Sequence, residues 1–185
     1  MTYENGKKSI LISFIGLLAL EFLSFINNAC YCLFDRAFLP SIPYVSYLFI
    51  LLAAFGFFVL WQSRKNTLDI AIAGALILTL IINFFWGRIL SRLLSSADNL
   101  KTYIIVSFLF TLIACAYLAI WALKMFKNGN VIAAGLLGAA FLYRCFSSVF
   151  YAVVVDLSGF GLIIYYFGFL VAAAIPAFVA FTDKE

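Results

Sequence analysis

The sequence predicts an all-α protein, a polytopic transmembrane helical bundle of six spanning helices joined by short loops. Of its 185 residues, 66% are hydrophobic and only 11% are charged. A soluble domain normally carries about a quarter charged residues, so these polar groups are too few to cover a water-soluble fold. Apolar runs of about 20 residues, the length that crosses a bilayer core, recur along the whole chain. We expect these runs to be helices, because backbone groups in lipid must be satisfied within each segment.

Six apolar segments form the predicted spans, and together they make one transmembrane domain over residues 1–185. The spans run approximately over Ser9–Leu33, Ile42–Trp61, Leu68–Gly87, Tyr103–Leu123, Val131–Val155 and Phe160–Phe181. Because most connections between them are short, successive helices should be antiparallel neighbours.

The distribution of basic residues predicts the orientation, since cytoplasmic loops carry an excess of Lys and Arg. With the amino terminus inside, the cytoplasmic side holds seven of them, namely Lys7, Lys8, Arg64, Lys65, Lys124, Lys127 and Lys184. The opposite side holds four, namely Arg36, Arg88, Arg92 and Lys101. We therefore expect a plasma (cytoplasmic) membrane protein, such as one of the bacterial cell inner membrane, with both termini in the cytoplasm.

The loop after the third span, WGRILSRLLSSADNLK, is amphipathic. Arg88, Arg92 and Asn99 recur at helical spacing, with leucines on the other side. The pattern favours an interfacial helix at 88–100, lying with its apolar face in the acyl boundary. It would serve as a lid, contact lipid headgroups, or simply connect two spans.

The remaining composition argues against several classes of function. The chain has no histidine, the usual zinc ligand and proton shuttle, and no catalytic motif, so we expect no enzyme, metal or cofactor. Its net charge of +4 comes from basic residues that are spread singly or in pairs, which does not indicate nucleic-acid binding. The four cysteines, Cys30, Cys32, Cys115 and Cys145, fit neither a metal site nor a disulfide framework and read as small buried hydrophobes.

Two ionisable residues fall deep inside predicted spans. Glu21 lies 12 residues beyond Ser9, and Arg144 lies 13 residues beyond Val131, on spans that run in the same direction. At about 1.5 Å per residue, both reach roughly the same depth near the membrane centre. A charge there costs about 2.5–3.5 kcal/mol on insertion scales, so we predict that the two side chains pair.

Other polar residues share the faces that carry these two charges. Asn28 continues the stripe of Glu21 toward the outer surface, Ser148 and Tyr151 accompany Arg144, and Asn83 lies on the outer half of the third span. Lipid would not tolerate these groups, so they must line a helix interface or a wet cavity. The predicted ligand-binding residues are therefore Glu21, Asn28, Asn83, Arg144, Ser148 and Tyr151.

Two functions remain open at this point. The first is the binding or translocation of a small solute or lipid through an outward-facing polar cavity. The second is a membrane interaction protein, such as an accessory, immunity or assembly factor, in which the same polar groups only set helix register. The pairs Ala134/Gly138 and Gly135/Ala139 on the fifth span favour close helix packing within the chain, with a partner membrane protein as the alternative.

Overall fold

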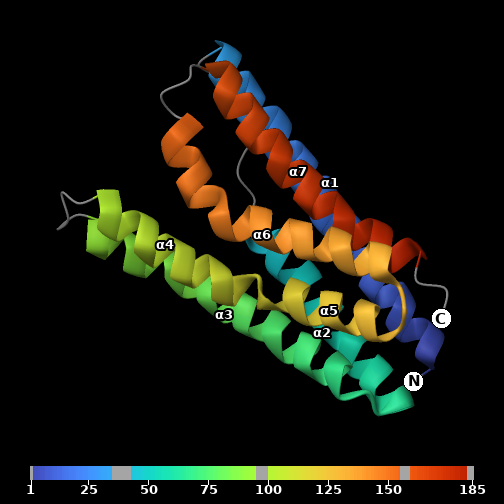
Figure 1. Ribbon diagram of the computed structural model, residues 1–185. Helices are drawn as coiled ribbons and strands as arrows, with labels where there is room; N and C mark the ends of the chain where they lie inside the picture. Colours follow the sequence, from blue (N-terminus) through green and yellow to red (C-terminus); the bar gives the residue numbers. More distant parts are fainter. Residues whose placement is uncertain (1, 35–42, 95–99, 155–158, 183–185) are drawn as a thin grey trace.

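The computed structural model describes residues 2–34, 43–94, 100–154 and 159–182, and every element in these ranges is an α-helix. The helices are α1 (Tyr3–Phe34), α2 (Pro43–Arg64), α3 (Thr67–Leu94), α4 (Leu100–Ala114), α5 (Ala116–Lys127), α6 (Val131–Val154) and α7 (Gly159–Thr182) (Figure 1). Four of them, α1, α2, α3 and α7, are long and apolar enough to cross a membrane, and α4 with α5 makes a fifth if that bent pair is one span. The predicted helical membrane architecture is confirmed at this level.

The helices form a closed ring in the order of the chain. Helix α2 packs between α1 and α3, α3 packs on α4 and α5, α6 packs on α4, α5 and α7, and α7 returns to α1. Both termini lie at one end of the ring, and the α1/α7 and α3/α4 pairs diverge as two arms away from that end (Figure 1). Short connections between antiparallel neighbours account for this up-and-down order.

The predicted interfacial helix at 88–100 is not found as a separate element. Residues 88–94 continue α3, which ends at Leu94, and Leu100 already begins α4. Residues 95–99 lie outside the described part of the chain. Helix α3 therefore runs beyond Gly87, because the residues after that glycine are mostly good helix formers and none is a proline.

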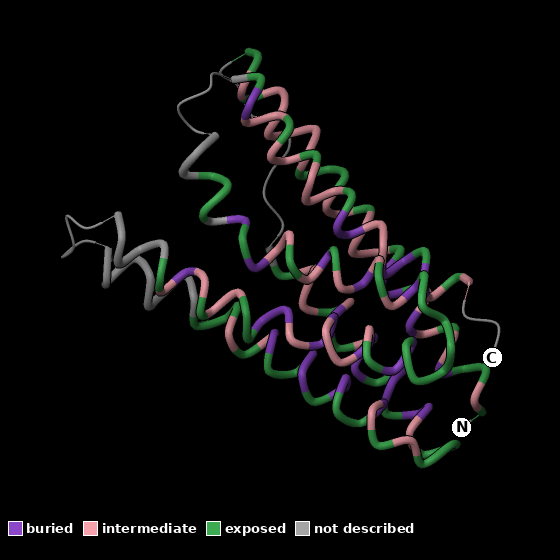
Figure 2. The backbone as a smooth tube through the Cα atoms, viewed as in Figure 1, coloured by how far each residue is buried: buried purple, intermediate pink, exposed green. Residues whose placement is uncertain are grey.

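The tightest packing lies in the half of the ring near the termini, where most buried positions gather (Figure 2). Its centre is Trp121 of α5, whose ring centroid lies 5.1 Å from that of Phe14 on α1 and 5.2 Å from that of Phe57 on α2. Aromatic pairs at this spacing add about 0.5–1.5 kcal/mol beyond the area that they bury. The three rings close the bundle at this end.

Helix α6 does not use its small residues in the predicted way. A side chain built at Gly135 or Gly138 would meet nothing within 4 Å in the described part of the chain. The buried face of α6 instead carries Ala133, Leu137 and Ala140. The expected packing within the chain is not found for the Gly135/Ala139 pair, because both residues lie on the exposed surface of α6. In the other pair, Ala134 packs against the core, whereas Gly138 has open space beside it in the described part of the chain.

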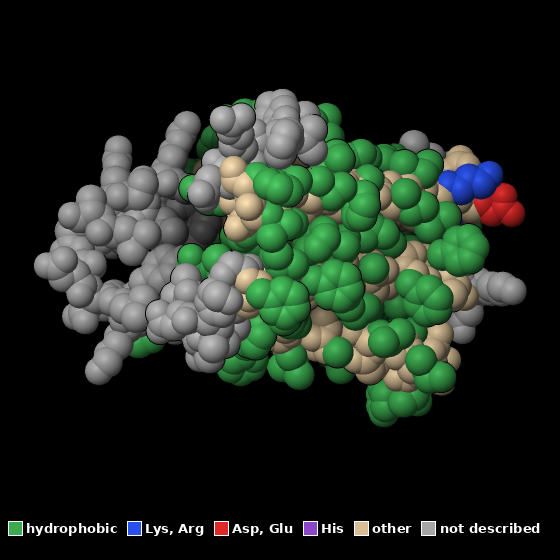
Figure 3. Space-filling view, turned by 90° about the horizontal axis from the view of Figure 1, so that it is seen from above, with side chains coloured by type: hydrophobic (Ala, Val, Ile, Leu, Met, Phe, Trp, Pro, Cys, Tyr) green, Lys and Arg blue, Asp and Glu red, His purple; other side chains and the backbone are tan. Residues whose placement is uncertain are grey.

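The outer surface of the ring is largely apolar. Figure 3 shows hydrophobic side chains over most of the described part of one face, with the visible charged side chains at the end that carries the termini. Large side chains such as Leu48, Phe126 and Phe167 are more than half exposed. A surface of this kind suits contact with lipid acyl chains.

Candidate functional site

A cavity of about 300 Å3 lies inside the ring, next to the packed aromatic cluster. All seven helices contribute lining residues. The polar and ionisable ones include Glu21, Ser46, Thr79, Asn83, Thr111, Cys115, Tyr117 and Arg144. The remaining wall is mostly aliphatic and aromatic, so polar groups converge on an otherwise apolar chamber, as in many ligand sites.

Glu21 and Arg144 both line this cavity, but they do not form the predicted direct contact. No salt bridge or hydrogen bond joins them, and neither side chain has such a partner elsewhere in the described part of the chain. The Nε atom of Arg144 is buried without a hydrogen-bond acceptor, and its guanidinium carbon lies 5.8 Å from the ring centroid of Phe169 on α7. The physical reason is the ring order, because α7 packs between α1 and α6 and holds the two charges apart.

The structure brings half of the predicted site residues together. Asn83 lines the same cavity as Glu21 and Arg144. Asn28 instead lines a second, smaller pocket that also contains Glu21, and its side-chain amide donates a hydrogen bond to the Ser24 hydroxyl at 3.4 Å. 

The last two predicted residues are farther along α6. Tyr151 is exposed, and its ring lies against that of Tyr165 on α7, with the ring centroids 5.3 Å apart and the ring planes tilted by 57°. Ser148 belongs to α6, but its side chain lies outside what the structure describes.

The segment formed by α4 and α5 is interrupted where it lines the cavity. Helices α4 and α5 meet at Cys115 with a bend of 46°. The Leu118 N–H donates to the Cys115 carbonyl at 2.9 Å. In a regular α-helix it would donate to the Ala114 carbonyl, which therefore lacks this donor. The Thr79 hydroxyl of α3 lies 2.6 Å from that carbonyl oxygen and donates to it. This bond satisfies the group that the break exposes, as buried backbone requires.

Sequence reasoning missed this break. The run LIACAYLAI contains neither proline nor glycine, the residues that usually mark a kink. Thr79 and Asn83 are one helical turn apart on the predicted third span, and this polar face is a signal for the cavity but not for the bend.

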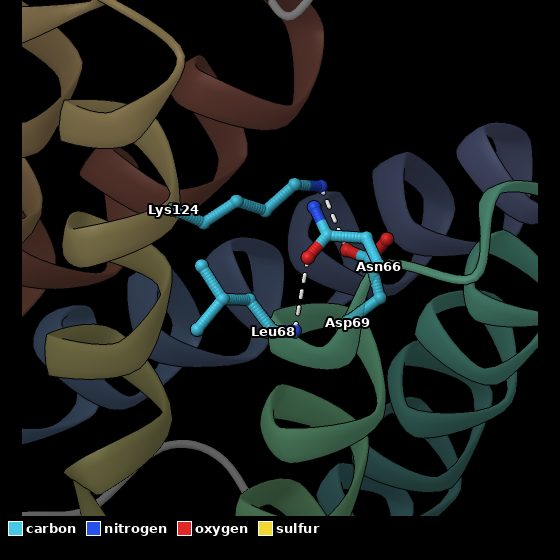
Figure 4. Close-up of polar contacts among 4 residues, drawn as sticks. All are labelled: Asn66, Leu68, Asp69 and Lys124. Atoms are coloured by element: carbon cyan, nitrogen blue, oxygen red, sulfur yellow. Dashed lines mark hydrogen bonds and ion pairs between the residues drawn. The ribbon is translucent and has the colours of Figure 1, made fainter.

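Sequence reasoning also missed a buried ion pair at the end of the ring that carries the termini. Lys124 Nζ of α5 lies 2.8 Å from Asp69 Oδ1 of α3, and the two side chains are 7% and 1% exposed (Figure 4). The Asn66 side chain accepts the Leu68 N–H at 3.0 Å, which caps α3 and places Asp69 in its first turn. One feature of the sequence points to this site. Asp69 follows closely after the Asn66 cap, in the first turn of the helix, where the helix dipole favours a negative charge.

Comparison with known proteins finds no matching family model, no matching curated sequence and no matching solved structure. Within the described ranges, no group of three or more His, Cys, Asp or Glu side chains could hold a metal ion.

Proposed function

We propose that this chain is a six-span membrane protein that binds or translocates a small solute or lipid through the cavity. In this proposal the α4–α5 pair is one broken span, and α6 is the sixth. Helix α6 has 24 residues, and at about 1.5 Å per residue it is long enough for a hydrocarbon core about 30 Å thick.

The observation that carries the proposal is the pair of unpartnered charges in one chamber. Glu21 and Arg144 line a cavity of about 300 Å3 and form no ion pair with any described residue. Ionisable groups inside a membrane are costly, and they usually mark a substrate or ion pathway. If these residues only set helix register, we would expect them to pack against each other and leave no void.

The break between α4 and α5 supports the same function. Irregular backbone at membrane depth is tolerated where it is buried in protein or lines a cavity, and discontinuous helices commonly form the sites of transporters. Here the break at Cys115 lies on the cavity wall, beside Thr111 and Tyr117. No residue in this proposal performs covalent chemistry, so we infer a non-enzymatic role.

The proposal includes an orientation. The side of the ring that carries the termini also carries helix ends and turns with five basic residues, namely Lys7, Lys8, Arg64, Lys65 and Lys127. The excess of Lys and Arg on cytoplasmic loops then puts both termini in the cytoplasm of a plasma membrane. The packed aromatic cluster would close the cavity on that side, and the diverging arms would face outward.

Access to the cavity provides the first test. Thr111 lines the cavity, whereas its neighbour Leu112 is 39% exposed on the outer surface. In a variant whose four native cysteines are replaced by serine or alanine, Thr111→Cys should react with a charged, membrane-impermeant thiol reagent about tenfold faster than Leu112→Cys, because only a hydrated thiol ionises readily. Equal rates at the two positions would contradict a hydrated cavity.

Occupancy of the cavity provides the second test. The Thr111→Trp variant should fill the chamber, and Leu112→Trp is its matched control on the outer surface. Protein purified in mild detergent is denatured, and the small molecules and lipids that it releases are measured by mass spectrometry. We expect a molecule that wild type and Leu112→Trp release and Thr111→Trp does not. Release of the same set by all three proteins would overturn the proposed function.

One observation favours a second candidate, a membrane interaction protein. Gly135 and Ala139 lie one turn apart on the exposed surface of α6, and Gly135 has open space beside it in the described part of the chain. Small residues at this spacing let two helices approach closely in lipid. Loss of a co-purifying membrane protein on Gly135→Leu, with an unchanged melting temperature, would support this candidate.

A further inference from the structure

A second pocket adjoins the main cavity and shares Glu21 with it. It is an open pocket of about 230 Å3 between α1 and α7. Aromatic side chains make up four of its seven lining residues, namely Phe25, Tyr165, Tyr166 and Phe169. Glu21 is its only charged residue within the described chain.

Three of these aromatic residues lie on α7, and the Tyr165 ring stands at a steep angle to both of the others. The Tyr165 ring lies 5.1 Å from that of Phe169 at 77°, and 5.3 Å from that of Tyr166 at 67°. Aromatic faces attract cations, and boxes of such rings recognise quaternary ammonium groups. With a carboxylate in the same wall, the pocket suits an ammonium group much better than an anion.

Arg144 provides the opposite charge next to Phe169. Its guanidinium carbon lies 5.8 Å from the Phe169 ring centroid, and its buried Nε has no acceptor in the described part of the chain. Arg144 is close enough to Glu21 to interact with it electrostatically. An unpaired guanidinium in a chamber of low polarity binds a carboxylate or phosphate well, because its planar fork fits two oxygens.

We propose that the ligand is a small zwitterion, whose ammonium group binds between Glu21 and the aromatic rings while its carboxylate or phosphate binds Arg144. This inference rests on the proposed function, since it names the class of molecule that the cavity holds. A zwitterion supplies a partner for each charge and adds no net charge to the membrane interior. A simple anion would leave Glu21 unpaired, and a simple cation would leave Arg144 unpaired.

Binding of matched probes to the full chain in a maltoside detergent tests the inference directly. The zwitterions are phosphocholine and glycine betaine, and choline and inorganic phosphate carry one charged group each. Losing one charge-assisted contact should weaken binding about 10- to 100-fold, so we expect each zwitterion to bind wild type at least about tenfold more tightly than either single-charge probe. Equal affinity for choline, or for phosphate, would overturn the inference while leaving solute binding intact.

Variants assign the two ends of the ligand. Glu21→Gln should remove the preference for phosphocholine over phosphate, and Arg144→Gln should remove the preference for phosphocholine over choline. Glu4→Gln, at an exposed position near the start of α1, is the charge-matched control and should change neither preference. Retention of both preferences in both site variants would contradict the assignment, and the wild-type measurement stands even if Arg144→Gln does not fold.

A final arm separates a lipid headgroup from a free solute, since both sources offer the same chemistry. The protein is reconstituted in nanodiscs of phosphatidylcholine or of phosphatidylglycerol, which lacks the ammonium group. If the ligand is a headgroup, phosphatidylcholine should compete with phosphocholine and phosphatidylglycerol should not. If it is a free zwitterion, the two membranes should give the same phosphocholine affinity. Absence of phosphocholine and glycine betaine binding in detergent and in both membranes would overturn the inference, even where the occupancy test above succeeds.

Discussion

Removing the carboxylate of Asp69 should destabilise the protein strongly. The perturbation is Asp69→Asn, which keeps the size of the side chain and leaves the Lys124 ammonium buried without its counter-ion. Lys124 Nζ lies 2.8 Å from Asp69 Oδ1, with side-chain exposures of 7% and 1%. At that distance the attraction is about 6 kcal/mol for an effective dielectric constant of about 20.

Only part of that attraction is net stability, because both ions lose their hydration on folding. Breaking a buried pair by removing one partner typically costs about 3–5 kcal/mol, whereas replacing both ions with apolar groups is often close to neutral. We therefore expect Asp69→Asn to lower the free energy of unfolding by about 3–5 kcal/mol. The double variant Asp69→Leu/Lys124→Met should recover most of this loss.

Unfolding in mixed detergent micelles, followed by the fluorescence of Trp121 and the other tryptophans, measures these free energies. Arg64→Met is the matched control, because Arg64 is exposed and its guanidinium carbon lies 4.1 Å from the centre of the Tyr3 ring. An exposed contact of this kind should cost no more than about 1 kcal/mol. The reasoning fails if Asp69→Asn costs no more than Arg64→Met, or if the double variant is less stable than Asp69→Asn alone.

Two further predictions concern helix packing, and both are measured as changes in melting temperature or free energy of unfolding. Thr79→Val removes the donor to the Ala114 carbonyl and should cost about 1–3 kcal/mol, because that group is then buried and unsatisfied; a loss below about 0.5 kcal/mol would contradict the account of the break. Gly56→Leu should destabilise strongly, because a Cβ there would lie 2.6 Å from Ile10, whereas Gly135→Leu meets open space and should be tolerated. Equal effects of the two leucines would refute this packing.

Much of the architecture could be predicted from the sequence. Each helix is specified by its own apolar run, and turn residues such as Asn66 and Asn130 cap the helices that follow them. The interfacial helix was not found because the residues after Gly87 can continue a helix as readily as start one. Amphipathic spacing alone does not tell whether the axis changes direction.

The candidate site was only partly predictable. Sequence spacing identified Glu21, Asn83 and Arg144, because polar residues at membrane depth are conspicuous in an apolar chain, and all three line the cavity. It could not foresee that Glu21 and Arg144 remain apart, because that depends on α7 lying between their helices. It also did not pair Asp69 with Lys124, which are 55 positions apart in the chain and meet only because α3 packs on α5.

The sequence by itself determined that the chain is helical and suited to lipid, since hydrophobicity and backbone hydrogen bonding act within each segment. It also indicated that Glu21, Asn83 and Arg144 lie inside the bundle, where all three line the cavity. The tertiary structure alone decided how those groups meet. Closure of the ring through α7 separates Glu21 from Arg144, and the break at Cys115 follows no local signal. The reason is physical, because the partner of a buried charge is set by which helices are neighbours, and that depends on the packing of the whole ring.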